Sequence, residues 1–394
     1  MDFINLMGAV WPEGNFWASL IKFFDVGNYA WTIILFTLVL KLVLSPLDFL
    51  QRYYTNKTTR MQAKLQPEME KLKKRYGQNQ TLLYQKQNEL YKKNNVGMKG
   101  SCIVMLVYMA VTLTVFLTFY SSLQTISGAN IKNQYEQLES TYTNSYEVEY
   151  YQNSLGINLE EFRLEKDAEK KEQMLESAKN TIIQYFVDEG KTEEEALEAF
   201  NNFNTTAIED SQEIAQKAVV EKYIQIKDSW LWIKNVWRAD NATITEIPTY
   251  EDYKALTGET SVTKTQYNLV MGKLLDNYKN TNQINGYYIL SIIVVAVSFL
   301  SQWLTRKLSS PRTKDGTKVQ QPGMGKILMF LMPIMMLMFT LSSSAIFAMY
   351  IIVNTLATTL LIPVSTFASN KIADKVEAKQ EKKRREALKV DYRR

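Results

Sequence analysis

Residues 32–46 read TIILFTLVLKLVLSP, an apolar run that carries a single charged residue, Lys41. About 20 apolar helical residues cross the roughly 30 Å hydrocarbon core of a bilayer. The apolar block around Lys41, residues 29–47, is of this length, so we expect a membrane-spanning helix. A fixed charge inside a span costs at least about 2.5–3.5 kcal/mol, so the position of Lys41 needs a physical reason.

Four further apolar blocks follow along the chain, although charged residues make up 22% of the sequence. The fourth of the five blocks is the shortest, and it needs flanking polar residues or a locally thinned bilayer to span. Ser342–Ser344 are expected to form the tight turn that follows it. The sequence thus predicts an all-α polytopic membrane protein with five transmembrane helices: Tyr29–Leu47, Cys102–Leu123, Gly286–Leu304, Ile327–Leu341 and Ala345–Ala368.

Charge alternates between the segments that connect these spans. Residues 51–100 contain 12 Lys and Arg against 3 Asp and Glu, whereas residues 125–285 contain 16 against 28. Residues 306–326 and 368–394 are again basic. Because basic loops stay in the cytoplasm, we expect the N-terminus and residues 125–285 outside and the C-terminus inside.

Short sequence signals divide the rest of the chain. Phe16, Leu20 and Phe23 recur at helical spacing before a break at Gly27-Asn28, which favours an interfacial amphipathic helix over a simple extension of the first span. An apolar stripe from Met61 to Tyr76, a turn signal and a second stripe predict a basic helical hairpin. The predicted segments are 1–28 interfacial helix, 29–50 first span, 51–98 cytoplasmic hairpin, 99–124 second span, 125–285 extracytoplasmic insertion, 286–305 third span, 306–326 cytoplasmic loop, 327–368 fourth and fifth spans, and 369–394 basic cytoplasmic tail.

The large insertion is expected to be mostly helical. Residues 159–227 are rich in Glu, Lys, Ala and Gln, and Thr192-Glu193-Glu194-Glu195 matches a capping box. Residues 241–285 indicate a strand or loop followed by a short helix. The aromatic stretch WLWIKNVW at 230–237 fits two interpretations, a membrane-surface belt and a local soluble core.

Lys41 also has two interpretations. It snorkels towards the membrane surface, with Asp48 seven residues away at the edge of its reach, or it faces a hydrated groove between the helices. Polar side chains at helical spacing in other spans provide candidate walls, although each pair alone is more often hydrogen-bonding glue between helices. No acidic residue lies inside a predicted span, so the groove interpretation expects a partner from outside the protein. The candidate groove residues are Lys41, Tyr108, Thr112, Ser298, Gln302, Tyr350, Asn354 and Thr358.

Composition argues against several kinds of chemistry. The chain has no histidine and one cysteine, Cys102, which excludes histidine acid–base catalysis, histidine metal ligands and a disulfide within the chain. No Walker-type phosphate loop is present. We therefore expect no enzymatic activity, no cofactor and no metal.

Several motifs resemble the YidC-type membrane protein insertases. A basic residue in the first span followed by Leu-Ser-Pro-Leu at 44–47 resembles that family's first core span. Further similar pieces are Met61-Gln62, Leu65-Gln66-Pro67-Glu68, Leu90-Tyr91-Lys92, Gly100-Ser101-Cys102, Trp230-Leu231-Trp232-Ile233, Tyr287-Tyr288-Ile289-Leu290, Met332-Pro333-Ile334-Met335 and Ala348-Met349-Tyr350. The family usually carries arginine at the position of Lys41, and lysine lacks the planar fork for bidentate carboxylate contact. Residues 125–227 and 241–285 have no counterpart in the common five-span core.

The resemblance implies a membrane insertase and chaperone in a bacterial plasma membrane. It would receive single-span or small nascent membrane proteins in a hydrated groove carrying Lys41 and release them sideways into lipid. The implied partners are the ribosome, a targeting receptor and the Sec translocon, with an unknown partner for residues 125–285. Basic residues offer either lipid anchoring or contacts with ribosomal RNA and the targeting machinery: Arg60, Lys64, Lys71, Lys73, Lys74, Arg75, Lys382, Lys383, Arg384 and Arg385.

Two other classes of protein stay open at this point. A polytopic transporter or channel with an extracytoplasmic sensing domain would carry repeated halves and further charges within its spans. A receptor or adhesin would use residues 125–285 as its binding part and the spans as an anchor. The sequence shows one charge in the spans and no internal repeat, which favours the insertase.

Overall fold

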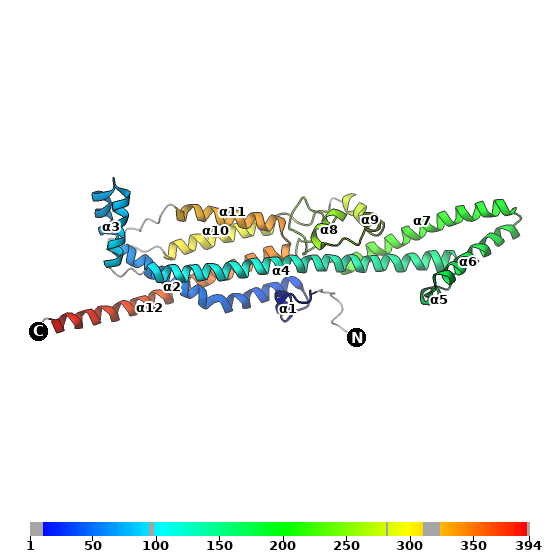
Figure 1. Cartoon of the computed structure of the whole chain (residues 1–394). Helices are drawn as coiled ribbons and strands as arrows, with labels where there is room; N and C mark the ends of the chain where they lie inside the picture. The colour runs from blue at the N-terminus through cyan, green and yellow to red at the C-terminus, as the bar shows by residue number, and fades with distance from the viewer. Residues whose placement is uncertain (1–10, 94–97, 281–282, 310–323, 392–394) are drawn as a thin grey trace. The chain divides into compact units, whose positions relative to one another are not determined.

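The structure is a computed structural model that describes residues 11–93, 98–280, 283–309 and 324–391. Over these ranges the chain is helical and has no named strand, so the predicted all-α class is confirmed. The helices are α1 (Phe16–Lys22), α2 (Tyr29–Tyr76), α3 (Gln80–Lys93), α4 (Met98–Glu147), the π-helix η1 (Val148–Ser154), α5 (Leu159–Leu164), α6 (Ala168–Asp188), α7 (Glu193–Ile226), α8 (Tyr250–Thr257), α9 (Lys264–Asn280), α10 (Ile289–Ser309), α11 (Met324–Ser342) and α12 (Ala345–Asp391) (Figure 1).

The chain divides into two compact units. The first, here called the span unit, comprises Glu13–Leu123 and Tyr288–Arg394. The second, the inserted unit, comprises Gln124–Tyr287 together with Trp11-Pro12 among the described residues. Helix α4 begins in the span unit and ends in the inserted unit.

Within the described residues, four helices are long and apolar enough to cross a membrane. They are Tyr29–Met61, Ile103–Ser154, Ile289–Leu308 and Ala345–Val376. The predicted fourth span corresponds to α11, whose described apolar part is only Leu331–Ser342. Helix α11 itself runs over 19 residues, Met324–Ser342. Length and composition thus support four spans among the described residues, and α11 as a further span stays a prediction.

The helical conformation is interrupted between α1 and α2. Asn15 caps α1 by accepting a hydrogen bond from the Ala18 amide at 3.0 Å. Gly27 has φ +81°, a left-handed conformation that glycine adopts without a steric penalty. Asn28 then caps α2 by accepting from the amides of Ala30 and Trp31. The predicted break at Gly27-Asn28 is therefore present.

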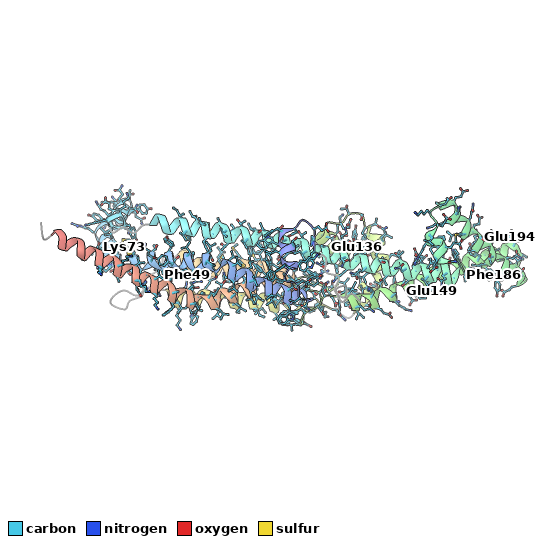
Figure 2. The ribbon with its side chains drawn as sticks, turned by 90° about the horizontal axis from the view of Figure 1, so that it is seen from below. Phe49, Lys73, Glu136, Glu149, Phe186 and Glu194 are labelled. Atoms are coloured by element: carbon cyan, nitrogen blue, oxygen red, sulfur yellow. The ribbon has the colours of Figure 1, made fainter. Side chains whose placement is uncertain are left out.

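Helix α2 continues without interruption from the apolar segment into the predicted hairpin. The first arm of that hairpin is therefore an extension of the span helix, and α3 forms the returning arm. Lys73 lies near the turn between α2 and α3 (Figure 2).

Two interactions join α2 to α12 beyond the apolar segments. The Asn56 amide donates to Ser369 Oγ at 2.7 Å, and both residues are buried. Four residues further on, the Arg60 guanidinium pairs with Asp374 at 2.6 Å. Helix α10 packs against both α11 and α12, so α12 links α2 with α10 in the span unit (Figure 1).

The inserted unit is built from the end of α4 and the helices α5 to α9. Thr192 and Glu195 form the predicted capping box at the start of α7. Helices α6 and α7 pack against each other, and α7 also packs against α9. The described part of residues 241–285 contains two helices, α8 and α9, where one was predicted. One isolated bridge, between Thr245 and Ile284, lies where a strand or loop was expected.

The aromatic stretch 230–237 contributes to a local core. Trp237 is 2% exposed, and its indole nitrogen donates to Asp228 Oδ2 at 2.6 Å. Burial raises the pKa of Asp228 above its ordinary value, and this indole bond opposes the rise. Leu231, by contrast, is 71% exposed at the tip of the turn Trp230–Ile233. The soluble-core interpretation therefore holds for Trp237.

Candidate functional site

Three charged residues follow one another along α2. Asp48 and Arg52 stand seven and eleven residues after Lys41, spacings that place all three on one face of a helix. Lys41 is 7% exposed and Asp48 is 9% exposed. A buried charge of either sign is costly unless it is paired, so the arrangement demands an internal partner for each.

The partner of Lys41 is Asp48. The ammonium nitrogen of Lys41 lies 2.5 Å from Asp48 Oδ2. The expectation that Lys41 lacks a counterion within the protein is therefore wrong. Asp48 is the first residue after the predicted apolar span. Helix α2 continues past it, and the apolar stem of Lys41 extends along this helix, so that the ammonium reaches the carboxylate.

The helix between these two residues contains a proline. Pro46 has no amide hydrogen, so it cannot donate to the carbonyl of Leu42 in the preceding turn. The Ser45 hydroxyl donates to that carbonyl instead, at 2.8 Å. The Ser-Pro pair thus keeps the helix continuous and its backbone satisfied between Lys41 and Asp48.

Arg52 and Tyr108 complete the group. Asp48 interacts electrostatically with the Arg52 guanidinium, and its carboxylate also interacts with the Tyr108 hydroxyl of α4. We refer to Lys41, Asp48, Arg52 and Tyr108 as the ion cluster. It holds two cations and one carboxylate. Tyr108 was predicted as a site residue, whereas Asp48 and Arg52 were not, although their spacing from Lys41 could have revealed them.

A second polar feature is a cavity of about 190 Å³ in the span unit. Four predicted site residues line it together: Ser298, Gln302, Tyr350 and Asn354. Lys41, Tyr108, Thr112 and Thr358 are not among its lining residues. Most of the lining surface is apolar, and the four predicted residues that line it add polar groups, which are the partners that a bound water would need. Its other lining residues are Phe116, Ser301, Met332, Pro333, Met336, Ile351 and Thr355.

Thr112 and Thr358 bond to their own helices. The Thr112 hydroxyl donates to the Tyr108 carbonyl at 2.7 Å, and the Thr358 hydroxyl donates to the Asn354 carbonyl at 2.7 Å. Such bonds to the preceding turn satisfy a hydroxyl without any partner on another helix. Hydrogen bonds within their own helices therefore satisfy the hydroxyl groups of Thr112 and Thr358.

An aromatic cluster lies towards the start of α2. Phe36 stacks on Phe119 of α4 with ring centroids 5.7 Å apart, and Tyr350 of α12 lies 4.4 Å from Phe119. Trp17 of α1 contacts Phe119 and donates its indole hydrogen to Thr118 at 3.1 Å. Aromatic rings from α1, α2, α4 and α12 therefore pack together around Phe36, which precedes Lys41 by five residues in α2.

The predicted basic residues are distributed over two helical regions. Lys71 and Arg75 line a groove of about 360 Å³ between α2 and α3, together with Glu68, Leu72, Lys86, Glu89, Leu90 and Lys93. Lys64, Lys73, Lys74 and Lys382 are exposed, whereas Arg60 pairs with Asp374. Lys383, Arg384 and Arg385 belong to α12, and their side chains lie outside the described residues.

Comparison with known proteins covers part of this arrangement. Residues 21–157 match the family described as 60Kd inner membrane protein. The chain is 35% identical over 104 residues to a membrane protein insertase YidC of Fusobacterium nucleatum. This part of the chain is similar to the membrane protein insertases named YidC. The family match over residues 21–157 contains α2, α3, the whole of α4 and η1, and hence the whole ion cluster.

The YidC relatives share only part of their length with this chain. The Fusobacterium match covers 26% of the chain and 49% of the relative. A YidC of Clostridium perfringens is 33% identical over 116 residues, covering 29% of the chain and 47% of the relative. A YidC of Stenotrophomonas maltophilia is 31% identical over 118 residues, covering 30% and 20%. The chain thus spans about half or less of these relatives' length, and no solved structure matches it.

Proposed function

We propose that this protein is a membrane protein insertase and chaperone that receives single-span or small membrane proteins and releases them sideways into the bilayer. The observation that supports this most strongly is the buried ammonium of Lys41, set within an apolar helix in the part of the chain that resembles YidC. The sequence contains no internal repeat, whereas many transporters are built from repeated halves.

The proposed mechanism begins with electrostatic attraction. A substrate must carry its polar or acidic outer tail across hydrocarbon, and Lys41 offers that tail a positive charge at depth. In surroundings of low effective dielectric constant, the attraction between a carboxylate and an ammonium is stronger than in bulk water. The cavity lined by Ser298, Gln302, Tyr350 and Asn354 would add polar groups for a substrate in the span unit.

Release relies on apolar burial. Helix α4 exposes a long apolar face, including Ile103, Met105, Leu106 and Met109. A substrate's apolar segment can slide along such a face and leave into lipid, where its own side chains are buried. The membrane potential assists acidic tails, because moving one charge through 100 mV is worth about 2.3 kcal/mol. The mechanism needs no covalent step.

The orientation and the partners belong to the proposal. The charge distribution supports an orientation with the N-terminus outside and the C-terminus in the cytoplasm of a bacterium. The exposed basic side chains of the α2–α3 hairpin would contact nascent substrates or a targeting receptor, and the tail would contact the ribosome. The Sec translocon is a further partner, and the inserted unit would bind a partner of its own.

Depletion of the protein tests the function as a whole. A newly made single-span substrate with an acidic outer tail is followed by protease protection, with and without the protein. We expect its membrane integration to fall on depletion and to recover when the gene is supplied again. A protein inserted by another route serves as the control. Unchanged integration of the acidic substrate would refute the insertase proposal.

A further inference from the structure

The ion cluster contains an internal competitor for any substrate carboxylate. Lys41 is already paired with Asp48 at 2.5 Å, and both side chains are buried. A substrate carboxylate that approaches Lys41 must therefore displace Asp48. A displaced carboxylate left buried without a partner would cost several kcal/mol and oppose binding.

Arg52 provides the place to which Asp48 can move. It stands four residues after Asp48 on the same helix, a spacing at which opposite charges face each other. The Arg52 guanidinium already interacts electrostatically with Asp48. A rotation of the Asp48 side chain towards Arg52 therefore exchanges one ion pair for another without moving the helix.

Charge balance gives this exchange its direction. The two cations and one carboxylate of the ion cluster leave one positive charge in excess. When a substrate carboxylate enters, each carboxylate has one cation: Lys41 for the substrate and Arg52 for Asp48. The exchange therefore ends with no charge of the ion cluster left without a partner.

We propose that Asp48 is an exchangeable internal ligand of Lys41, and that Arg52 receives it when a substrate carboxylate binds. This inference rests on the proposed insertase function and adds two positioning residues to it. Asp48 stabilises Lys41 at rest, so the ammonium is not left bare in the membrane. Arg52 lowers the cost of opening the pair and thereby makes the site selective for tails that bring a carboxylate.

The experiment uses the full-length protein in the depletion strain and two substrates that differ at one residue of the outer tail. One substrate has an aspartate in its outer tail, and the other has asparagine at the same position. Integration of both is measured with the wild type, Arg52→Gln, Asp48→Asn and the double variant, and Arg52→Lys is the matched control that keeps the charge. Membrane accumulation of each variant is measured in parallel.

The exchange predicts a specific pattern of suppression. Arg52→Gln lowers integration of the aspartate substrate by about fivefold or more, the lower end of ordinary coupling between sites, and hardly changes the asparagine substrate. Arg52→Lys retains activity. Adding Asp48→Asn to Arg52→Gln restores the aspartate substrate, because no displaced carboxylate then needs a partner. A merely structural role of Arg52 would leave the double variant as impaired as the single one.

Other outcomes overturn the inference and separate it from the function itself. If Arg52→Gln has no effect, or if Asp48→Asn does not suppress its defect, the exchange is wrong even when Lys41→Ala impairs integration. If Arg52→Gln alone fails to accumulate, Asp48→Asn is compared with Asp48→Asn/Arg52→Gln. Equal integration by these two supports the exchange, and lower integration by the double variant contradicts it. Failure of depletion to affect any acidic substrate would instead remove the proposed function.

Discussion

At the scale of single residues, the ion pair between Lys41 and Asp48 stabilises two buried charges on the first span helix. Each side chain is less than a tenth exposed, so each charge needs a partner within the protein, and the two side chains partner each other. Breaking such a pair by removing one member typically costs about 3–5 kcal/mol, whereas replacing both members by apolar residues is often neutral. The pair is therefore expected to matter more for function than for stability.

Two variants separate these contributions. Asp48→Leu leaves the Lys41 ammonium buried without its carboxylate, so we expect a fall of several degrees in Tm in detergent. Lys41→Met/Asp48→Leu removes both charges, and we expect its Tm to return close to that of the wild type while integration of acidic substrates stays low. A double variant as unstable as Asp48→Leu would show that the pair contributes net stability.

Glu259 in the inserted unit gives a residue-scale prediction about pH. Its carboxylate accepts a hydrogen bond from the Lys132 ammonium and further bonds from the amide and hydroxyl of Ser261. These bonds lower the pKa of Glu259 from 4.5 to about 2. A lowered pKa in the folded state stabilises the fold above about pH 4.5, and this contribution disappears as the pH falls towards 2.

The corresponding measurement compares Glu259→Gln with the wild type. We expect the variant to have a lower Tm at pH 6, and the difference should shrink as the pH is lowered from 4.5 towards 2. Glu176→Gln, which removes an exposed carboxylate from α6, is the control for net charge. A Tm difference that stays constant over this pH range would contradict the assignment.

Residue patterns in the sequence predicted the cation of the site, and they indicated its partner Asp48 only through the snorkelling interpretation of Lys41. Lys41 stands out because it is the one charge in a long apolar run. Asp48 lies just beyond that run, where hydropathy assigns it to the polar flank, and only the continuity of α2 through Ser45-Pro46 brings it to Lys41. Ser298, Gln302, Tyr350 and Asn354 were recognised by helical spacing, and the structure places them around one cavity.

At the scale of elements, the pairing of α2 with α12 organises the span unit. Both helices continue far beyond their apolar segments, and the Asn56–Ser369 and Arg60–Asp374 contacts join them there. The buried amide–hydroxyl bond should matter more than the exposed ion pair, because exposed ion pairs are worth about 0–1 kcal/mol. The α2–α12 contact is therefore expected to persist in the working protein.

Disulfide trapping tests this contact. In a Cys102→Ser background with a protease site introduced at Gly190-Lys191, Asn56→Cys and Ser369→Cys should form a disulfide readily. The cleaved fragments would then stay linked until reduction. Lys57→Cys with Ser369→Cys is the matched control, because Lys57 is exposed. Equal linkage in the two pairs would contradict the specific packing of Asn56 against Ser369.

Element prediction succeeded where local chemistry sets a boundary and failed where a helix simply continues. The capping box at Thr192 and the break at Gly27-Asn28 depend on nearby side chains, and both are present. The extension of α4 to Glu147 and its passage into the π-helix Val148–Ser154 carry no comparable local signal. Packing of Tyr150 and Tyr151 against the cluster of Leu155, Ile157 and Phe162 accompanies that change of helix type.

At the scale of the whole molecule, the two compact units separate an apolar part from a polar part of the chain. Its topology can be tested by labelling single cysteines in a Cys102→Ser background. We expect a membrane-impermeant maleimide to modify Glu194→Cys in intact cells and Lys73→Cys only after permeabilisation (Figure 2). Labelling of both positions in intact cells, or of neither, would contradict the orientation argued from charge.

The proposed insertase function depends on the charge at Lys41, which holds the carboxylate of an incoming tail. The most direct test measures membrane integration of an aspartate-tailed single-span substrate and its asparagine twin by the wild type, Lys41→Arg and Lys41→Ala. We expect Lys41→Ala to impair integration of the aspartate substrate, Lys41→Arg to preserve it, and integration of the asparagine substrate to change little. Integration by Lys41→Ala equal to that of the wild type across several acidic substrates would contradict this role of Lys41.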